Sequence, residues 1–127
     1  MKKIYAYTDI RYPGWIKVGE TMRHPEERIR EQYLTSIPCP PLPYKIELST
    51  EAIKTDGDVF SDHDVHRMLC AMGIKRGYGE WFLANVNDVL KAISFIRNNK
   101  QPEEIYEEMV NEFNRCKLGT TGNSNAS

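Results

Sequence analysis

The sequence lacks paired cysteines and any long apolar run. Its three cysteines, Cys39, Cys70 and Cys116, are widely spaced, so neither a disulfide framework nor a C-x-x-C zinc knuckle is supported. The apolar residues near the start are too few in a row for a signal peptide or a membrane-spanning helix. We therefore expect a protein of a reducing, cytoplasmic compartment that has no membrane partner.

A surplus of charge is also lacking, because 17 basic and 18 acidic side chains leave a net charge of −1. This balance gives no global signature of nucleic-acid binding, but it is compatible with a local basic patch, because a partner meets the surface potential. What is present is an ordinary composition, 40% hydrophobic and 28% charged over 127 residues. Such a chain is typical of one soluble domain with a single core.

Two short runs near the start alternate apolar and polar side chains, as half-buried strands do. They span residues 3–8 and 15–20, and the segment Tyr12-Pro13-Gly14 between them is a turn signal. The sequence therefore predicts a β-hairpin. This hairpin is expected to bring four polar side chains near one another: Tyr5, Tyr7, Lys17 and Glu20.

Helical and extended patterns alternate along the rest of the chain. The sequence predicts helices that start at Pro25, span 58–72, follow an Asn85 cap and start at Pro102, and extended segments at 36–43, 44–49 and 80–83. An early hairpin followed by helices favours an α+β fold. We expect a small three- to four-stranded antiparallel sheet flanked by helices, with an added C-terminal helix.

The end of the chain is small and polar. Gly119 stands where a helix end is expected, so we predict one domain over residues 1–118 and a disordered tail or linker over 119–127. Such a tail is compatible with a chain that is the front piece of a longer protein, such as a restriction or helicase fusion.

Ionisable side chains gather in four places near the ends of these elements. They are Tyr5, Tyr7 and Lys17; Arg23, His24, Arg28 and Arg30; Asp62, His63, Asp64 and His66; and Lys75, Arg76 and Glu80. Hydrolysis of a phosphodiester needs a cation for the phosphate, a carboxylate for a divalent metal and a proton acceptor for water. Asp62 and His66 are four residues apart and project from one helical face. Taken singly, each of these residues is better explained by packing or by a solvated surface.

The order of these residues along the chain resembles the GIY-YIG nuclease superfamily, in a branch of short phage and bacterial domains. The first tripeptide of that family corresponds to Lys3-Ile4-Tyr5, the second to Lys17-Val18-Gly19, and its helix arginine to Arg28. The motifs V-K-I-G-x-T, P-E-E-R, E-x-x-x-H and E-W-F correspond to 16–21, 25–28, 62–66 and 80–82. The resemblance covers roughly residues 3 to 95.

Three positions depart from the family pattern. Lys3 replaces a glycine, Lys17 replaces a tyrosine, and Asp62 replaces a glutamate. Lys17 can still stabilise phosphate charge as a point cation, and Asp62 can still bind Mg²⁺, which prefers oxygen ligands.

The resemblance implies a DNA endonuclease that depends on a single Mg²⁺ or Mn²⁺ ion. Asp62 would hold the metal, with Glu80 as a second or alternative carboxylate. Arg28 and Lys17 would neutralise the scissile phosphate, and Tyr5 or His66 would accept the proton of the attacking water. The residues expected to contact the DNA backbone are Lys3, Arg23, Lys75 and Arg76. The DNA would be double-stranded or branched, in a restriction, repair or mobile-element system.

Two alternatives stay open at this point. The same fold could serve as a catalytically weak DNA-binding module within a larger protein, which salt-sensitive binding without cleavage would reveal. The chain could also be an interaction domain that uses Ile105, Met109 and Phe113 of its acidic last helix, although we expect that helix to pack on the core.

Overall fold

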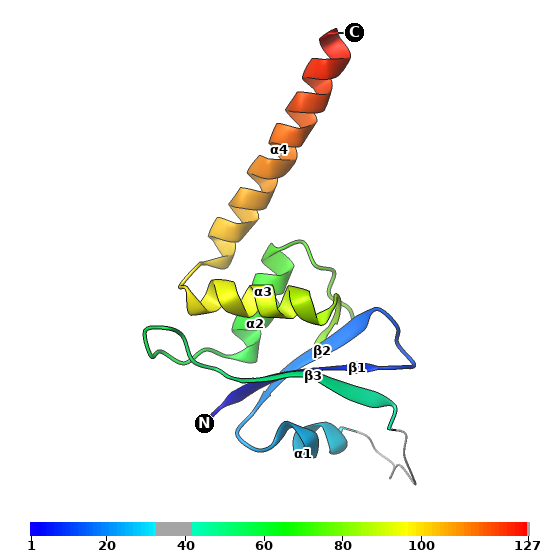
Figure 1. The fold of residues 1–127 in the computed structure, drawn as a ribbon, viewed down its shortest axis with the longest axis vertical. Helices are drawn as coiled ribbons and strands as arrows, with labels where there is room; N and C mark the ends of the chain where they lie inside the picture. Colours follow the sequence, from blue (N-terminus) through cyan, green and yellow to red (C-terminus); the bar gives the residue numbers. More distant parts are fainter. Residues whose placement is uncertain (33–41, 127) are drawn as a thin grey trace.

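The structure is a computed structural model that describes the backbone of residues 1–32 and 42–126 and the side chains of 1–32 and 42–117 (Figure 1). Its strands are β1 (Lys3–Asp9), β2 (Trp15–Thr21), β3 (Tyr44–Glu51) and β4 (Trp81–Leu83). Its helices are α1 (Pro25–Arg30), α2 (Asp62–Ala71), α3 (Val86–Arg97) and α4 (Pro102–Ala126). The strands form one antiparallel sheet in the order β3-β1-β2-β4. This architecture confirms the predicted α+β fold.

Strand alternation gives the sheet two different faces. Ile4, Ala6, Ile16 and Val18 join the main core, together with the apolar sides of α2 and α3. The opposite face carries Tyr5 and Tyr7, which form a smaller cluster with Ile29 of α1, Tyr44 and Trp81. Figure 1 shows α2 and α3 on one side of the sheet and α1 on the other. The sheet therefore separates an apolar core from a layer of aromatic and polar side chains.

The hairpin of β1 and β2 forms as predicted, and Gly14 in its turn has φ +87°. Tyr5 pairs with Gly19 and Tyr7 pairs with Lys17. The prediction that the Glu20 side chain lies beside Tyr5, Tyr7 and Lys17 is wrong. Because Glu20 is three residues from Lys17, the two-residue period turns its side chain to the other face, toward α2.

Helix α2 starts later than the sequence pattern indicates. Its N-cap is Ser61, which forms a capping box with Asp64, so the predicted start at residue 58 is wrong. The residues before it are extended: the Phe60 amide donates to the Ala52 carbonyl, and the Lys54 amide donates to the Asp58 carbonyl. These backbone bonds to the segment just before it hold 58–60 out of the helix.

Helix α4 extends away from the rest of the molecule (Figure 1). Ile105 is buried, but Met109, Val110 and Phe113 are exposed, so the expectation that this helix packs on the core is wrong beyond its second turn. The helix also continues past Gly119, where an end was expected. The division into a domain over 1–118 and a tail over 119–127 stays a prediction.

Several sequence predictions concern segments or properties that the fold only partly addresses. Most of the proline-rich segment, together with Cys39, lies outside the described residues. Cys70 and Cys116 are free, in agreement with the spacing of the cysteines. Among the described helices there is none that combines the length and the apolar character needed to cross a membrane.

Candidate active site

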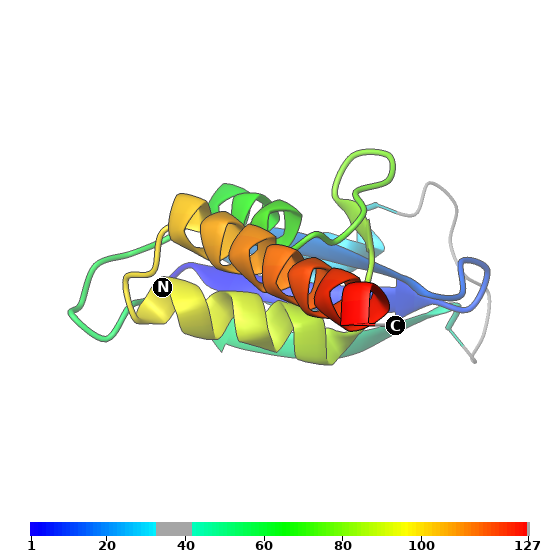
Figure 2. The same cartoon turned by 90° about the horizontal axis from the view of Figure 1, so that it is seen from above.

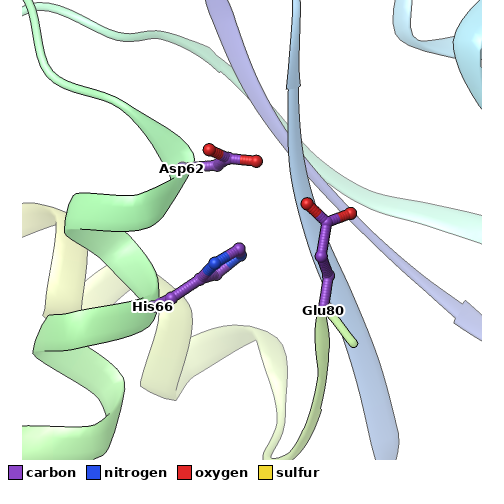
Figure 3. A group of neighbouring side chains, drawn as sticks. All are labelled: Asp62, His66 and Glu80. Carbon is purple, nitrogen blue, oxygen red and sulfur yellow. The ribbon is translucent and has the colours of Figure 1, made fainter. Parts of the chain in front are cut away.

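Three side chains that the sequence analysis selected converge beside β2. Asp62 is the first residue of α2 and His66 lies one turn later, while Glu80 immediately precedes β4. One ligand atom from each residue lies within 4.8 Å of the others (Figure 3). Asp62 and His66 are buried, and Glu80 is half-buried. The structure therefore brings together three of the residues to which the family resemblance gives roles.

The sheet register explains the position of Glu80. Strand β4 pairs antiparallel with β2 from Trp15 to Lys17. One residue further along β2, the Val18 amide donates a hydrogen bond to the Glu80 carbonyl at 3.1 Å. Glu80 is thus fixed beside the strand that α2 covers. Two segments distant in the sequence meet at this point because both pack on β2.

His66 holds a nitrogen that the protein does not use. Its Nε2 atom lies 2.8 Å from the Val18 carbonyl, which can only accept, so Nε2 carries the proton. The other nitrogen, Nδ1, then has a free lone pair and is buried without a hydrogen-bond partner among the described residues. Burial lowers the pKa of His66, which keeps the ring neutral. Such a nitrogen can bind a metal ion or accept a proton.

Glu20 is a member of the site that the sequence analysis missed. Its Oε1 atom accepts a hydrogen bond from the Asp62 amide at 3.2 Å, and Lys2 lies 3.1 Å from its other oxygen. A signal was available in the sequence, because Glu20 follows Ile16 and Val18 at the same two-residue period. That period places an acid on the core face of a strand.

The carboxyl groups of this cluster influence one another's ionisation. Burial raises the pKa of Asp62 to about 8, and hydrogen bonding and repulsion from Glu20 and then Glu80 act in the same direction. Burial opposes ionisation of Glu20 too, but its hydrogen bonds with Asp62 and Lys2 outweigh burial and lower the pKa of Glu20. Asp62 therefore holds a proton at neutral pH. A divalent cation would favour loss of that proton, so the donor set of two or three carboxylates and one imidazole fits a bound metal ion.

The Tyr5 side chain lies over Gly19, where the charges of Glu80 and Asp62 act on it. A Cβ atom at Gly19 would lie 2.5 Å from the Tyr5 hydroxyl oxygen, so only glycine leaves room for the phenol. The hydroxyl accepts a hydrogen bond from Gln32 Nε2 at 2.9 Å. Burial raises the pKa of Tyr5 and outweighs the opposing effects of Gln32 and of the Arg28 charge. The phenol therefore stays protonated near neutral pH.

Gln32 connects the polar residues on this face of the sheet. Its Oε1 atom accepts from the Tyr7 hydroxyl and from Lys17 Nζ, each at 2.7 Å. Burial lowers the pKa of Lys17, an effect that the Glu80 charge opposes. The sequence analysis gave Gln32 no such role, because its three partners come from strands that precede it by 15 to 27 residues.

The guanidinium of Arg28 influences the pKa values of the polar side chains on this face of the sheet. Its charge acts on both Tyr5 and Lys17. Among the residues with described side chains, it has neither a hydrogen bond nor an ion pair. Arg28 is therefore available to an anionic ligand.

The four residues expected to contact DNA are distributed differently. Lys75 and Arg76 are exposed in the loop that leads to Glu80, whereas Arg23 is held in an ion pair with Glu31 at the end of α1. Lys3 lies at the start of β1, opposite Thr21. Of the four, Lys75 and Arg76 lie nearest in the chain to a residue of the convergent cluster, five and four positions before Glu80.

A comparison with protein families matches the T5orf172 domain over residues 2–97, and the chain belongs to this family. The domain is found in nuclease-like proteins of phages and bacteria, which indicates a nuclease-like or DNA-binding role. The matched span includes every site residue above and ends where α3 ends. There is no match among curated proteins or among solved structures.

Proposed function

We propose that the chain is a metal-dependent endonuclease of the GIY-YIG type that hydrolyses phosphodiester bonds in DNA. The observation that carries this proposal is the meeting of Asp62, His66 and Glu80 within 4.8 Å, with a nitrogen lone pair on His66 that no residue of the described part of the chain uses. Buried ionisable groups gathered in this way are costly unless a ligand completes them. Membership of a nuclease-like family supports the same conclusion.

Asp62 and Glu80 are the residues we assign to a single Mg²⁺ or Mn²⁺ ion. Carboxylate oxygens suit both ions. When bound, such a cation supplies positive charge to the phosphate and lowers the pKa of a coordinated water. The Glu20 carboxylate hydrogen-bonds the Asp62 amide and thereby positions the first residue of α2.

His66 is the residue we assign as proton acceptor, in preference to Tyr5. The pKa of His66 is lowered and its Nδ1 atom is free, whereas the pKa of Tyr5 is raised, so the phenolate is scarce at neutral pH. Tyr5 is better suited to donate a hydrogen bond to a phosphate oxygen. Lys17 and Arg28 supply cations on the same side of the sheet, and Lys17 acts without the bidentate geometry of an arginine.

The runner-up is a DNA-binding module of the same fold that cleaves weakly. The observation that favours it is Lys17, which stands where the related nucleases have a tyrosine and is bonded to Gln32. In either case the partner is DNA, alone or presented by a fused restriction or helicase subunit.

A cleavage assay on supercoiled plasmid DNA separates these proposals. We expect wild-type protein to nick or linearise DNA with Mn²⁺ or Mg²⁺ and to lose activity in EDTA. The double variant Asp62→Asn/Glu80→Gln is expected to be inactive, while Glu103→Gln/Glu104→Gln on α4 is the charge-matched control. Cleavage by the site variant at the wild-type rate would refute the metal assignment. Salt-sensitive binding without cleavage by wild-type protein would select the binding module.

A further inference from the structure

An aromatic side chain projects into solvent next to the candidate site. Tyr78 is 95% exposed, the highest value among the exposed large apolar and aromatic side chains that the structure describes. It lies in the loop between α2 and β4, which rises beyond the neighbouring helices in Figure 2. The sequence analysis treated this loop only as a source of positive charge, and the aromatic ring needs a separate explanation.

The turn that carries Tyr78 is held in place by its own backbone. The Trp81 amide donates to the Tyr78 carbonyl at 3.3 Å, and the Gly77 amide donates to the Trp81 carbonyl at 2.7 Å. The Trp15 ring fills the space beside Gly77, where a Cβ atom would lie 2.5 Å from a ring carbon. Gly79 has φ +63°, which turns the chain back toward β4. The ring is thus presented by an ordered support, which lowers the entropy cost of binding.

Two cationic side chains share the loop with this ring. Lys75 and Arg76 are both exposed in the same loop, and Arg76 Nε donates to the Gly79 carbonyl at 2.8 Å. The Arg76 guanidinium lies 5.4 Å from the centre of the Phe82 ring, which fixes its direction. Cations that flank an exposed aromatic ring match a nucleic-acid strand, whose phosphates and bases offer negative charge and flat rings.

The position of Tyr78 limits which nucleotide it can meet. Tyr78 precedes Glu80 by two positions, with only Gly79 between them, so their Cα atoms are at most about 7 Å apart. Along one DNA strand, successive nucleotides rise by about 3.4 Å. Because each side chain adds its own length to this distance, the ring lies within a few nucleotide steps of a phosphate bound beside Glu80.

We propose that Tyr78 stacks on a nucleobase within a few nucleotides of the scissile phosphate, and that the chain therefore prefers DNA with an unpaired base at that position. A base inside a continuous duplex must first be unstacked, which costs a few kcal/mol, whereas a bulged, gapped or flapped base is already available. The location of the phosphate rests on the proposed function, but the stacking itself does not require hydrolysis.

The test compares binding to two DNAs of equal length, one fully paired and one with a single bulged base. Fluorescence anisotropy in EDTA keeps binding separate from cleavage. Wild-type protein and Tyr78→Phe are expected to prefer the bulged DNA. Tyr78→Ala is expected to bind the bulged DNA about 10-fold more weakly, with a smaller loss on paired DNA. Tyr106→Ala, another exposed tyrosine, on α4, is the matched control and should behave as wild type.

The outcomes distinguish this inference from the proposed function. Equal binding of both DNAs by wild-type protein, no binding of either, or no effect of Tyr78→Ala would overturn the stacking. A loss in Tyr78→Phe as large as in Tyr78→Ala would assign the contact to the hydroxyl group and would also overturn it. A wild-type protein that shows the expected binding pattern but does not cleave plasmid DNA with Mn²⁺ would refute the endonuclease and leave the stacking supported.

Discussion

The polar groups on the two sides of the sheet differ in how far the protein satisfies them. On the α1 side, Gln32 bonds Tyr5, Tyr7 and Lys17, so each buried polar group has a partner. On the α2 side, the buried Nδ1 atom of His66 has no partner among the described residues, and Asp62 has a pKa raised to about 8. A hydrogen-bond network whose groups all have partners holds side chains in position, whereas buried polar groups without partners can bind a ligand. The difference points to the α2 side as the place where a metal ion is expected.

The largest effect on cleavage is expected from a substitution of His66, on the α2 side of the sheet. His66→Gln removes the free ring nitrogen and should lower the single-turnover cleavage rate by about 10²- to 10⁴-fold. If His66 accepts a proton, the affinity for Mn²⁺ should stay near the wild-type value. A Mn²⁺ affinity that falls together with the rate would show instead that the imidazole is a metal ligand.

Asp62→Asn should sharpen the comparison between the two sides of the sheet, because it removes a buried group that ionises only at high pH. The folded pKa of Asp62, about 8, lies above the unfolded value of about 3.9, so ionisation costs the wild-type fold stability as pH rises from about 4 to 8. Asparagine cannot ionise. The melting temperature of the variant should therefore exceed that of wild type by more at about pH 8.5 than at about pH 5.

Thermal melts at these two pH values, with and without Mn²⁺, check this expectation. The ion should raise the melting temperature of wild type and leave the variant unchanged. A difference between the two proteins that is independent of pH would contradict the raised pKa of Asp62.

The smallest effect is expected on the completed side. Gln32→Ala removes one side chain that serves three partners and should cost about 1–3 kcal/mol of unfolding free energy, because buried hydroxyl groups lose their hydrogen bonds. The neighbouring Glu31→Ala breaks only an exposed ion pair and should change stability by less than about 0.5 kcal/mol. Urea unfolding measures both. Equal losses would mean that the Gln32 network contributes nothing beyond the surface contacts of α1.

The sequence contains the local part of this arrangement. Two-residue alternation places Ile4 and Tyr5 on opposite faces, and four-residue spacing places Asp62 and His66 on one face of α2. These regularities involve residues near one another in the sequence, and they are sufficient to predict most of the site residues.

The rest depends on contacts that the pattern of a single element does not show. Helix α2 starts at Asp62 because 58–60 bond to 52–54, and Gln32 bonds the hairpin because α1 packs beneath it. Glu20 was assigned to the wrong face, although its period was readable. The exposure of Met109 and Phe113 on α4 depends on the direction in which that helix leaves the domain, which no local pattern encodes.

The central claim is that Asp62 and Glu80, beside His66, hold a divalent cation. Calorimetric titration of the full chain with Mn²⁺, above pH 8 where Asp62 is ionised, tests it most directly. We predict saturable binding of a single ion by wild type and by Glu103→Gln/Glu104→Gln, and none by Asp62→Asn/Glu80→Gln. No binding by wild-type protein, or unchanged binding by the site variant, would contradict the claim.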